Sequence, residues 1–112
     1  MSANESGNDS LQQIEDLDRT IHAPTRLKIM ACLSVVKRAD FNYLLHQTGL
    51  TRGNLSPNLR KLEEANYVSI QKEFVDNKPR TLIQLTDEGH TALQTYREGM
   101  QSVLDELLGE KG

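Results

Sequence analysis

Apolar residues recur every three or four positions near the start of the chain, which is the spacing of one face of a helix. We expect a short amphipathic helix over residues 11–21. Its apolar positions are Leu11, Ile14, Leu17 and Ile21. Pro24 then begins a second helix over residues 24–36, because proline is tolerated at the first helical position. The apolar face of the second helix consists of Leu27, Met30, Ala31 and Leu33.

Two further helices are predicted by capping residues combined with apolar spacing. Asp40 is a candidate N-cap for a helix over residues 41–48, and Gly49 lies where its C-cap is expected. Thr51 is a candidate N-cap for the next helix, over residues 52–65. The apolar stripe of this helix consists of Leu55, Leu59 and Leu62.

Pro57 lies inside this last segment and leaves two geometries open. Either Ser56 caps a short helix that begins at Pro57, or Thr51 caps one continuous helix with Pro57 in its second turn. In the continuous helix Pro57 cannot donate a hydrogen bond to the Gly53 carbonyl, which costs up to about 3 kcal/mol. The leucine stripe passes through the proline in phase, so we favour the continuous helix, bent or loosened near Gly53.

After Ala65 the apolar period changes from that of a helix to that of a strand. Val68 and Ile70 alternate with polar residues, and residues 80–86 alternate in the same way. The intervening residues 76–79 (DNKP) have strong turn chemistry. These segments predict a β-hairpin with a basic tip.

Thr86 is a candidate cap for a long final helix over residues 87–108. Its apolar residues step by three and four, as in a heptad repeat. They exceed what a small core covers, as does the apolar face of the first helix, so we expect both to form a two-fold dimer. The residues assigned to the dimer are Leu11, Ile14, Leu17, Leu93, Tyr96, Met100, Val103, Leu104 and Leu107. The alternative is a final helix that folds back onto its own core.

Charge is distributed unevenly along the chain. The formal net charge of the 112 residues is −3, which by itself argues against a nucleic-acid partner. Residues 19–80, however, carry eleven basic side chains against five acidic ones, and both ends of the chain are acidic. Because the local field decides where a polyanion docks, this pattern indicates a nucleic-acid-binding middle. The alternative is ordinary charge scatter.

No residue pattern indicates catalysis, a cofactor or a metal site. The three histidines are widely spaced and accompany no cluster of ligands. The single cysteine, Cys32, lies in an apolar helical stretch and is expected to be a buried thiol in a reducing cytosol. No apolar run approaches the length of a membrane span, and no signal segment opens the chain. We therefore expect a cytoplasmic protein that is not an enzyme.

The order helix, tight turn, helix, hairpin defines a helix-turn-helix followed by a wing. The segment DFNYLLHQTGLTRGNLSPNLRKLEEANYVSIQKEFVDNKPRTLIQLTDEG resembles the winged helix-turn-helix core of small bacterial and archaeal transcriptional regulators of the MarR/ArsR type. The resemblance covers residues 20–95 or so and is most specific in GLTRGNLSPNLRKLEEANYV and RTLIQLTDEG. It implies that the helix at 52–65 enters a major groove, while the wing at 76–80 reaches the backbone or the minor groove.

Helix geometry supports the same outer face, because at about 100° per residue Pro57 lies opposite the leucine stripe. The residues assigned to DNA contact are Arg52, Gly53, Asn54, Ser56, Pro57, Asn58, Arg60, Lys61, Lys72, Lys78 and Arg80. Three have structural alternatives. Arg60 can pair with Glu63 or Glu64 on its own helix. Asn58 can face only solvent, and Arg80 can brace the hairpin.

The chain departs from the family pattern at two positions. Asn66 stands where glycine is usual, and asparagine tolerates the left-handed backbone needed to end the helix. Pro57 stands where a hydrogen-bonding or basic side chain is common, so one DNA contact is absent and its ring can instead pack on a thymine methyl group. The paired cysteines of metal-sensing ArsR proteins are also absent, which argues against that route of metal sensing.

These observations predict a mainly α protein with a small β-hairpin, an α+β winged helix-turn-helix with an extended C-terminal dimerisation helix. The expected divisions are a disordered tail (1–10), a winged helix core with a leading helix (11–86), a dimerisation helix (87–108) and a tail (109–112). The expected function is a regulator, most simply a repressor, that binds a pseudo-palindromic double-stranded DNA site as a homodimer. The alternative is a protein-interaction module without DNA binding. The sequence neither supports nor excludes a small effector.

Overall fold

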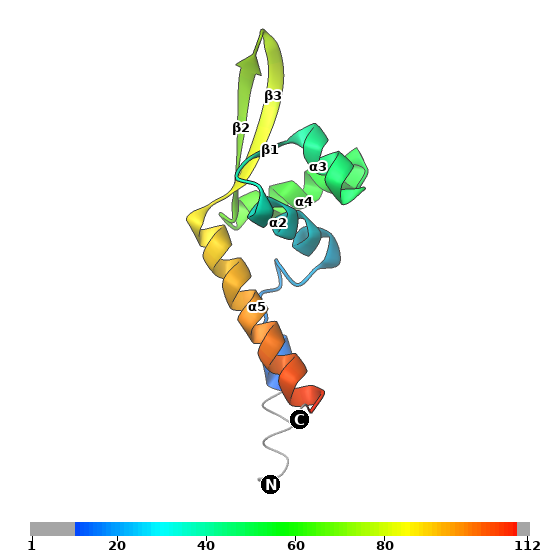
Figure 1. The fold of residues 1–112 in the computed structure, drawn as a ribbon, viewed down its shortest axis with the longest axis vertical. Helices are drawn as coiled ribbons and strands as arrows, with labels where there is room; N and C mark the ends of the chain where they lie inside the picture. Colours follow the sequence, from blue (N-terminus) through cyan, green and yellow to red (C-terminus); the bar gives the residue numbers. More distant parts are fainter. Residues whose placement is uncertain (1–10, 110–112) are drawn as a thin grey trace.

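The structure is a computed structural model that describes residues 11–109. The predicted tail at residues 1–10 and the last three residues lie outside this range. The elements follow in the order α2 (Pro24–Val35), β1 (Ala39–Asp40), α3 (Phe41–Thr48), α4 (Arg52–Glu64), β2 (Val68–Val75), β3 (Lys78–Leu85) and α5 (Asp87–Leu107) (Figure 1). This mainly helical winged helix, with a three-stranded antiparallel sheet and a long C-terminal helix, confirms the predicted fold class.

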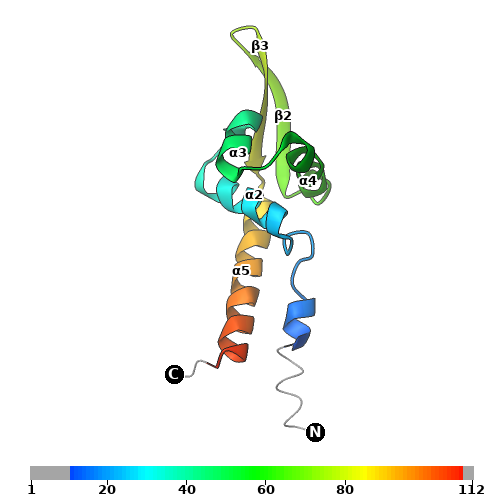
Figure 2. The same ribbon diagram turned by 90° about the vertical axis from the view of Figure 1, so that its right-hand side faces the viewer.

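The core lies where α2, α3 and α4 meet the inner part of the sheet. Its largest fully buried side chains are Ile21, Ile29, Met30, Leu33, Leu44, Leu55, Leu62 and Ile83. The wing and α5 project from opposite ends of this core (Figures 1 and 2). The core therefore holds α4 between a wing on one side and a long helix on the other.

All three predicted N-caps are confirmed. The side chains of Asp40, Thr51 and Thr86 accept hydrogen bonds from the backbone N–H groups three residues later, at 2.7, 3.2 and 2.9 Å. At the other end of α3, Gly49 has the left-handed φ of 70° expected of a C-cap. The turn between α3 and α4 is thus fixed at both sides by local sequence.

The wing is a two-residue hairpin. Asp76 and Asn77 have φ values of 55° and 63°, as in a type I′ turn, and join β2 to β3. β3 begins at Lys78, so the expectation that Pro79 belongs to the turn is wrong, and Pro79 pairs with Phe74 across the sheet. The two-residue strand β1, which no sequence pattern predicted, pairs with Ile83 and Leu82 of β3.

The start of α5 is clamped to the junction between α4 and β2. The Thr86 N–H donates to the Tyr67 carbonyl at 3.0 Å, and the Thr86 hydroxyl donates to the Asn66 carbonyl at 2.6 Å. A Cβ atom on Gly89 would lie 2.1 Å from the Tyr67 carbonyl oxygen, so only glycine fits this approach. Asn66 has a φ of 66°, which confirms that it takes the left-handed position that ends α4.

The predicted first helix is shorter than expected. Helical residues end at residue 15, so the expectation of a helix over 11–21 is wrong in its second half. The reason is Asp18, whose carboxylate accepts hydrogen bonds from the N–H groups of Thr20 at 2.8 Å and Ile21 at 3.2 Å. Leu17 and Ile21 are nevertheless buried, as their apolar spacing predicted.

Candidate nucleic-acid interface

α4 buries one side and exposes the other. Leu55, Leu59 and Leu62 are at most 3% exposed, which confirms the predicted stripe. Turning these three residues inward leaves the polar face in solvent. The exposed residues on it are Arg52, Gly53, Asn54, Ser56, Pro57, Arg60 and Lys61, followed by Glu63 and Glu64 in the last turn.

α4 continues through Pro57, which confirms the continuous helix predicted from the stripe. The Thr51 carbonyl accepts hydrogen bonds from both Asn54 (3.1 Å) and Leu55 (2.8 Å), so the first turn is anchored before the proline. Pro57 has no N–H to donate to the Gly53 carbonyl. The outer face of α4 therefore carries a proline ring next to a glycine backbone.

Gly53 is not required by packing within the chain. A Cβ atom at this position would meet only the Thr51 hydroxyl oxygen, at 4.0 Å. Glycine inside a helix is destabilising relative to alanine by about 0.5–1 kcal/mol. A glycine that the fold does not need, on the exposed face of α4, is consistent with close approach of something outside the chain.

Arg52 is held at the start of α4 by residues of α3. Its guanidinium donates to the Asn42 side-chain oxygen at 3.2 Å and lies 5.5 Å from the centre of the Phe41 ring. These contacts limit the conformations of a long, exposed side chain. They keep a positive charge beside the N-terminus of α4, where backbone N–H groups also favour an anion.

Asn58 has a structural position that the assignment to DNA contact did not anticipate. Its side-chain oxygen accepts from Arg26 at 3.0 Å, and its amide donates to the Asn54 carbonyl at 2.7 Å. Arg26 also donates to the Thr20 carbonyl at 2.6 Å. Half-buried Asn58 thus joins α4 to Arg26 of α2, and its geometry does not support the predicted DNA contact.

Arg80 connects the wing to the helices. Its guanidinium lies 2.8 Å from the Asp40 carboxylate, which also caps α3 through Tyr43. These hydrogen bonds, first from the Tyr43 backbone and then from Arg80, hold the pKa of Asp40 below its usual value. This geometry supports the bracing alternative for Arg80.

An open groove of about 580 Å³ runs between α4 and the wing. Arg60 on α4 and Lys72 on β2 both line it, and Glu63 is the one acidic residue in its lining. Its other lining residues are Phe41, Ser56, Leu59, Ile70 and Thr81. Two basic side chains from different elements thus line one groove, and their positive charge suits a sugar-phosphate backbone.

Lys61 and Lys78 lie apart from this groove. Lys61 lines a shallow hollow on α4 together with Arg19 and Arg26, while exposed Lys78 begins β3 at the wing tip. Arg19 is distant in sequence from α4, so no sequence pattern indicated its place beside Lys61. Thr81 was not predicted either, although strand alternation places Thr81 opposite Lys72.

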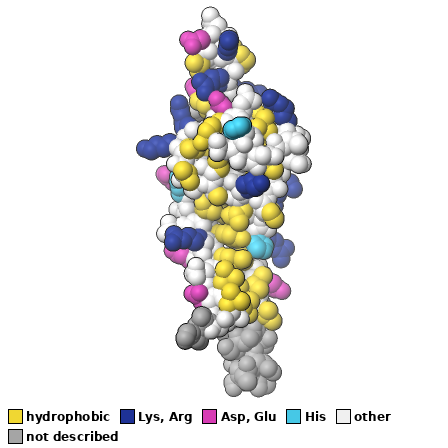
Figure 3. All heavy atoms as spheres, turned by 45° about the vertical axis from the view of Figure 1, so that its right-hand side comes forward, with side chains coloured by type: hydrophobic (Ala, Val, Ile, Leu, Met, Phe, Trp, Pro, Cys, Tyr) yellow, Lys and Arg dark blue, Asp and Glu magenta, His cyan; other side chains and the backbone are white. Residues whose placement is uncertain are grey.

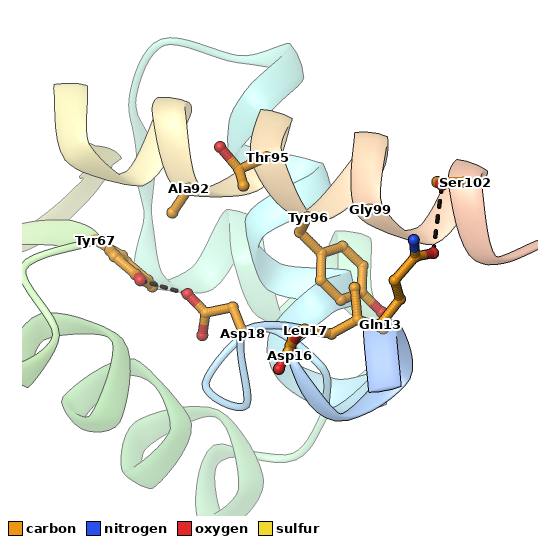
Figure 4. A pocket seen from close by; sticks show the side chains of 10 residues that line it. All are labelled: Gln13, Asp16, Leu17, Asp18, Tyr67, Ala92, Thr95, Tyr96, Gly99 and Ser102. Atoms are coloured by element: carbon orange, nitrogen blue, oxygen red, sulfur yellow. Dashed lines mark hydrogen bonds between the residues drawn. The ribbon is translucent and has the colours of Figure 1, made fainter. Parts of the chain in front are cut away.

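A separate cavity of about 610 Å³ lies between the N-terminal segment and α5 (Figure 4). Tyr67 points toward Asp18 there and donates a hydrogen bond to its carboxylate, which raises the pKa of Tyr67 to about 12. The lining includes the carboxylates of Asp16 and Asp18 and no lysine or arginine. Such a cavity repels anions, so it is not part of a nucleic-acid interface.

The residues assigned to the dimer divide into three groups. Leu17, Tyr96 and Val103 are at most 7% exposed within the single chain, so they are not available on its surface. Ile14, Leu93 and Met100 are half-buried. Leu11, Leu104 and Leu107 are 57%, 42% and 47% exposed, and Leu108 is 74% exposed. Figure 3 shows hydrophobic side chains running down the part of the molecule that α5 forms, while most Lys and Arg side chains on this face lie around the core and the wing.

Residues 11–109 hold no cluster of three or more His, Cys, Asp or Glu side chains suited to a metal ion. Within the same range, no helix has the length and apolar character needed to cross a membrane. Cys32 is half-buried, and desolvation raises the pKa of its thiol.

Residues 25–104 match the winged helix DNA-binding domain, and the chain belongs to that family. An uncharacterized protein of Methanocaldococcus jannaschii is 35% identical over 78 residues, which cover 70% of this chain and 85% of that protein. A transcriptional regulator homologue from Pyrococcus horikoshii has a similar structure, with a TM-score of 0.80 and 28% identity, covering 86% of this chain and 97% of that chain. A MarR-family regulator from Silicibacter pomeroyi shares the fold at 16% identity, with a TM-score of 0.61, covering 95% and 70% of the two chains.

These comparisons agree with the resemblance found in the sequence. The chain is a winged helix DNA-binding domain whose structural neighbours are MarR-family and other transcriptional regulators.

The Asp40–Arg80 pair gives a prediction about stability. Asp40→Asn keeps a capping side chain but removes the charge. Because the pair is partly exposed, we expect a loss of less than about 1 kcal/mol at neutral pH. The folded-state pKa of Asp40 is lowered, so its stabilisation is present above the ordinary value of 3.8 and is lost as pH falls through the lower folded value.

Denaturant unfolding of both proteins at neutral and acidic pH measures this difference, which should shrink below pH 3.8. A double-mutant cycle with Arg80→Gln isolates the pair from the cap. A difference between the proteins that is the same at every pH would contradict the prediction.

Proposed function

We propose that this protein is a sequence-specific transcriptional regulator that represses by occupying a DNA site as a homodimer. The observation that carries the proposal is the exposed face of α4, which combines basic and amide side chains with a glycine beside a basic groove. α4 carries Arg52, Arg60 and Lys61, and its only acidic residues, Glu63 and Glu64, lie in its last turn. An acidic α4 or an uncharged wing would have favoured a protein-interaction module instead.

In the proposed complex α4 lies in the major groove. Asn54 and Arg60 have the donor and acceptor geometry that reads base edges, whereas Lys61 and Lys72 hold phosphate. Gly53 permits close approach of the backbone, and the apolar ring of Pro57 packs on a thymine methyl group. The proposal assigns Asn58 and Arg80 to positioning these elements, because their polar atoms are engaged within the chain.

The homodimer forms through the leucines that remain exposed on α5, assisted by Leu11. Leu104, Leu107 and Leu108 are 42%, 47% and 74% exposed at the end of a helix that extends beyond the core. A two-fold dimer places two copies of α4 about one DNA turn apart, which favours a pseudo-palindromic site. Such a dimer blocks a promoter by occlusion.

Arg60→Ala tests the DNA contact. If each protomer neutralises about four to six phosphates, affinity falls steeply with salt. Arg60→Ala should weaken binding by about tenfold or more and should leave thermal unfolding nearly unchanged, because Arg60 is exposed. Fluorescence anisotropy across salt concentrations, on duplexes selected by the protein from a random pool, measures this.

Arg97→Ala is the matched control, since Arg97 is also an exposed arginine but lies on α5. It should bind DNA like the wild type. A flat salt response in the wild type, or equal losses in both variants, would contradict the proposal.

Gly53→Ala separates function from stability. The fold has room for the methyl group, so the free energy of unfolding should rise by about 0.5–1 kcal/mol. If the α4 backbone touches DNA, the same variant should bind about tenfold more weakly, a change of about 1.4 kcal/mol.

Thr91→Ala is the control, because it raises helix propensity at an exposed position of α5. A stabilised Gly53→Ala protein with unchanged affinity would show that the α4 backbone at Gly53 does not approach DNA closely.

The dimer is tested by Leu104→Glu combined with Leu107→Glu. Burying two carboxylates at the interface should weaken the dimer by at least about a hundredfold. Sedimentation at tens of micromolar should give a dimer for the wild type and a monomer for this variant. Val35→Glu is the control, since Val35 is 84% exposed on α2. A monomeric wild type would refute the interface.

A further inference from the structure

The two faces of the wing differ in chemistry. Because successive residues of a strand point to opposite faces, the register divides the hairpin into two rows of pairs. One row consists of Val68–Leu85, Ile70–Ile83, Lys72–Thr81 and Phe74–Pro79. Val68, Ile83 and Leu85 are buried, and Ile70, Lys72 and Thr81 line the groove beside α4. This row therefore faces the core and α4.

Phe74 lies at the solvent end of this row. Its side chain is 75% exposed, and its cross-strand partner Pro79 is exposed as well. β1 pairs with β3 only at Leu82 and Ile83, so the outer part of the wing consists of two strands. Together Phe74 and Pro79 form an exposed apolar pair at the end of the wing, which contributes little to the stability of the fold and is free to contact a molecule outside the chain.

The wing tip is held in a defined shape. Asp76 and Asn77 form the two-residue turn with left-handed backbone angles, and Pro79 has a fixed φ. The paired strands on either side of the turn place Phe74 opposite Pro79. The apolar pair is thus presented by a short, ordered tip rather than by a long loop.

The chemistry around the pair fits a polyanion. Lys72 lies two residues before Phe74 on β2, on the same face of the hairpin. Lys78 and Arg80 are the sequence neighbours of Pro79 on β3. Of the nearby acids, Glu73 lies opposite Arg80 on the other face, and Asp76 lies in the turn. On the face directed toward α4, Lys72 is therefore the charged residue next to the apolar pair.

The order of these groups defines where Phe74 meets DNA. If α4 occupies the major groove, Lys72 on the wing side of the groove beside α4 holds the adjacent sugar-phosphate backbone. Phe74 lies two residues nearer the wing tip than Lys72 on the same strand. The backbone separates the two grooves of the duplex, so the side chain beyond it faces the minor groove.

We propose that Phe74 and Pro79 form an apolar wedge that enters the minor groove of the bound DNA, partly unstacks one base step and bends the duplex. This inference rests on the proposed DNA-binding function. Apolar side chains inserted between base steps kink DNA by about 20–90°. The wedge adds specificity for flexible pyrimidine–purine steps that the protein does not read by hydrogen bonding.

The experiment measures bending and affinity separately. The probe is a duplex of about 30 base pairs, selected by the protein from a random pool and labelled at both ends for energy transfer. The wild type should shorten the end-to-end distance. Phe74→Ala should abolish most of this change and weaken binding by about 5- to 100-fold, the range for loss of one stacked aromatic contact. The salt dependence should stay the same, because no charge is removed.

Two variants serve as controls. Phe74→Leu keeps an apolar wedge and should retain most of the bend. Val75→Ala removes an apolar side chain that is 37% exposed on the opposite face and should bend DNA like the wild type. Because Phe74 is exposed, Phe74→Ala should unfold at the wild-type temperature, so a loss of bending cannot be assigned to misfolding.

The outcomes separate this inference from the proposed function. Salt-dependent binding with the same bend in wild type and Phe74→Ala overturns the wedge and leaves the DNA-binding function intact. Loss of the dimer in Phe74→Ala, measured by sedimentation, overturns the wedge by showing that a second copy covers Phe74. A wild type that binds no duplex from the pool overturns both the function and the wedge.

Discussion

Burial of the α4 leucine stripe is the constraint on which the rest of the structure depends. Leu55, Leu59 and Leu62 together remove apolar surface equivalent to several kcal/mol from water, and they allow only one rotation of α4 about its axis. That rotation decides which side chains reach solvent. The same burial keeps Pro57 inside the helix, because the packing of the stripe outweighs the single backbone hydrogen bond that the proline cannot make.

The sequence predicted the features that arise from neighbouring residues, namely the three caps, the leucine stripe, the hairpin and the left-handed Asn66. It did not predict contacts between distant residues. Arg26 and Asn58 are 32 positions apart, and Arg80 and Asp40 are 40 apart, yet both pairs change the assignment of a DNA contact. The two-residue strand β1 was also missed, since its pairing depends on β3 rather than on a pattern of its own.

The apolar positions in the heptad pattern of α5 divide into two groups that spacing alone cannot distinguish. Tyr96 and Val103 are buried within the chain, and a Cβ atom on Gly99 would lie 3.0 Å from the Leu17 side chain. The leucines nearer the C-terminus stay exposed. The N-terminal segment thus occupies part of the seam, and it does so only because the turn at Asp18 brings Leu17 and Ile21 into the core.

The contacts between the start of α5 and the junction of α4 with β2 fix the direction in which α5 leaves the core. The Thr86 hydrogen bonds and the contact at Gly89 leave no flexible linker at the base of α5. In a dimer joined at the far end of α5, the separation of the two α4 helices is therefore set by the protein before DNA arrives. In the proposed dimer, a small change of the angle between the two copies of α5 would move the α4 helices by a distance that grows with the length of α5, so the geometry of α5 would set the half-site spacing that the dimer tolerates.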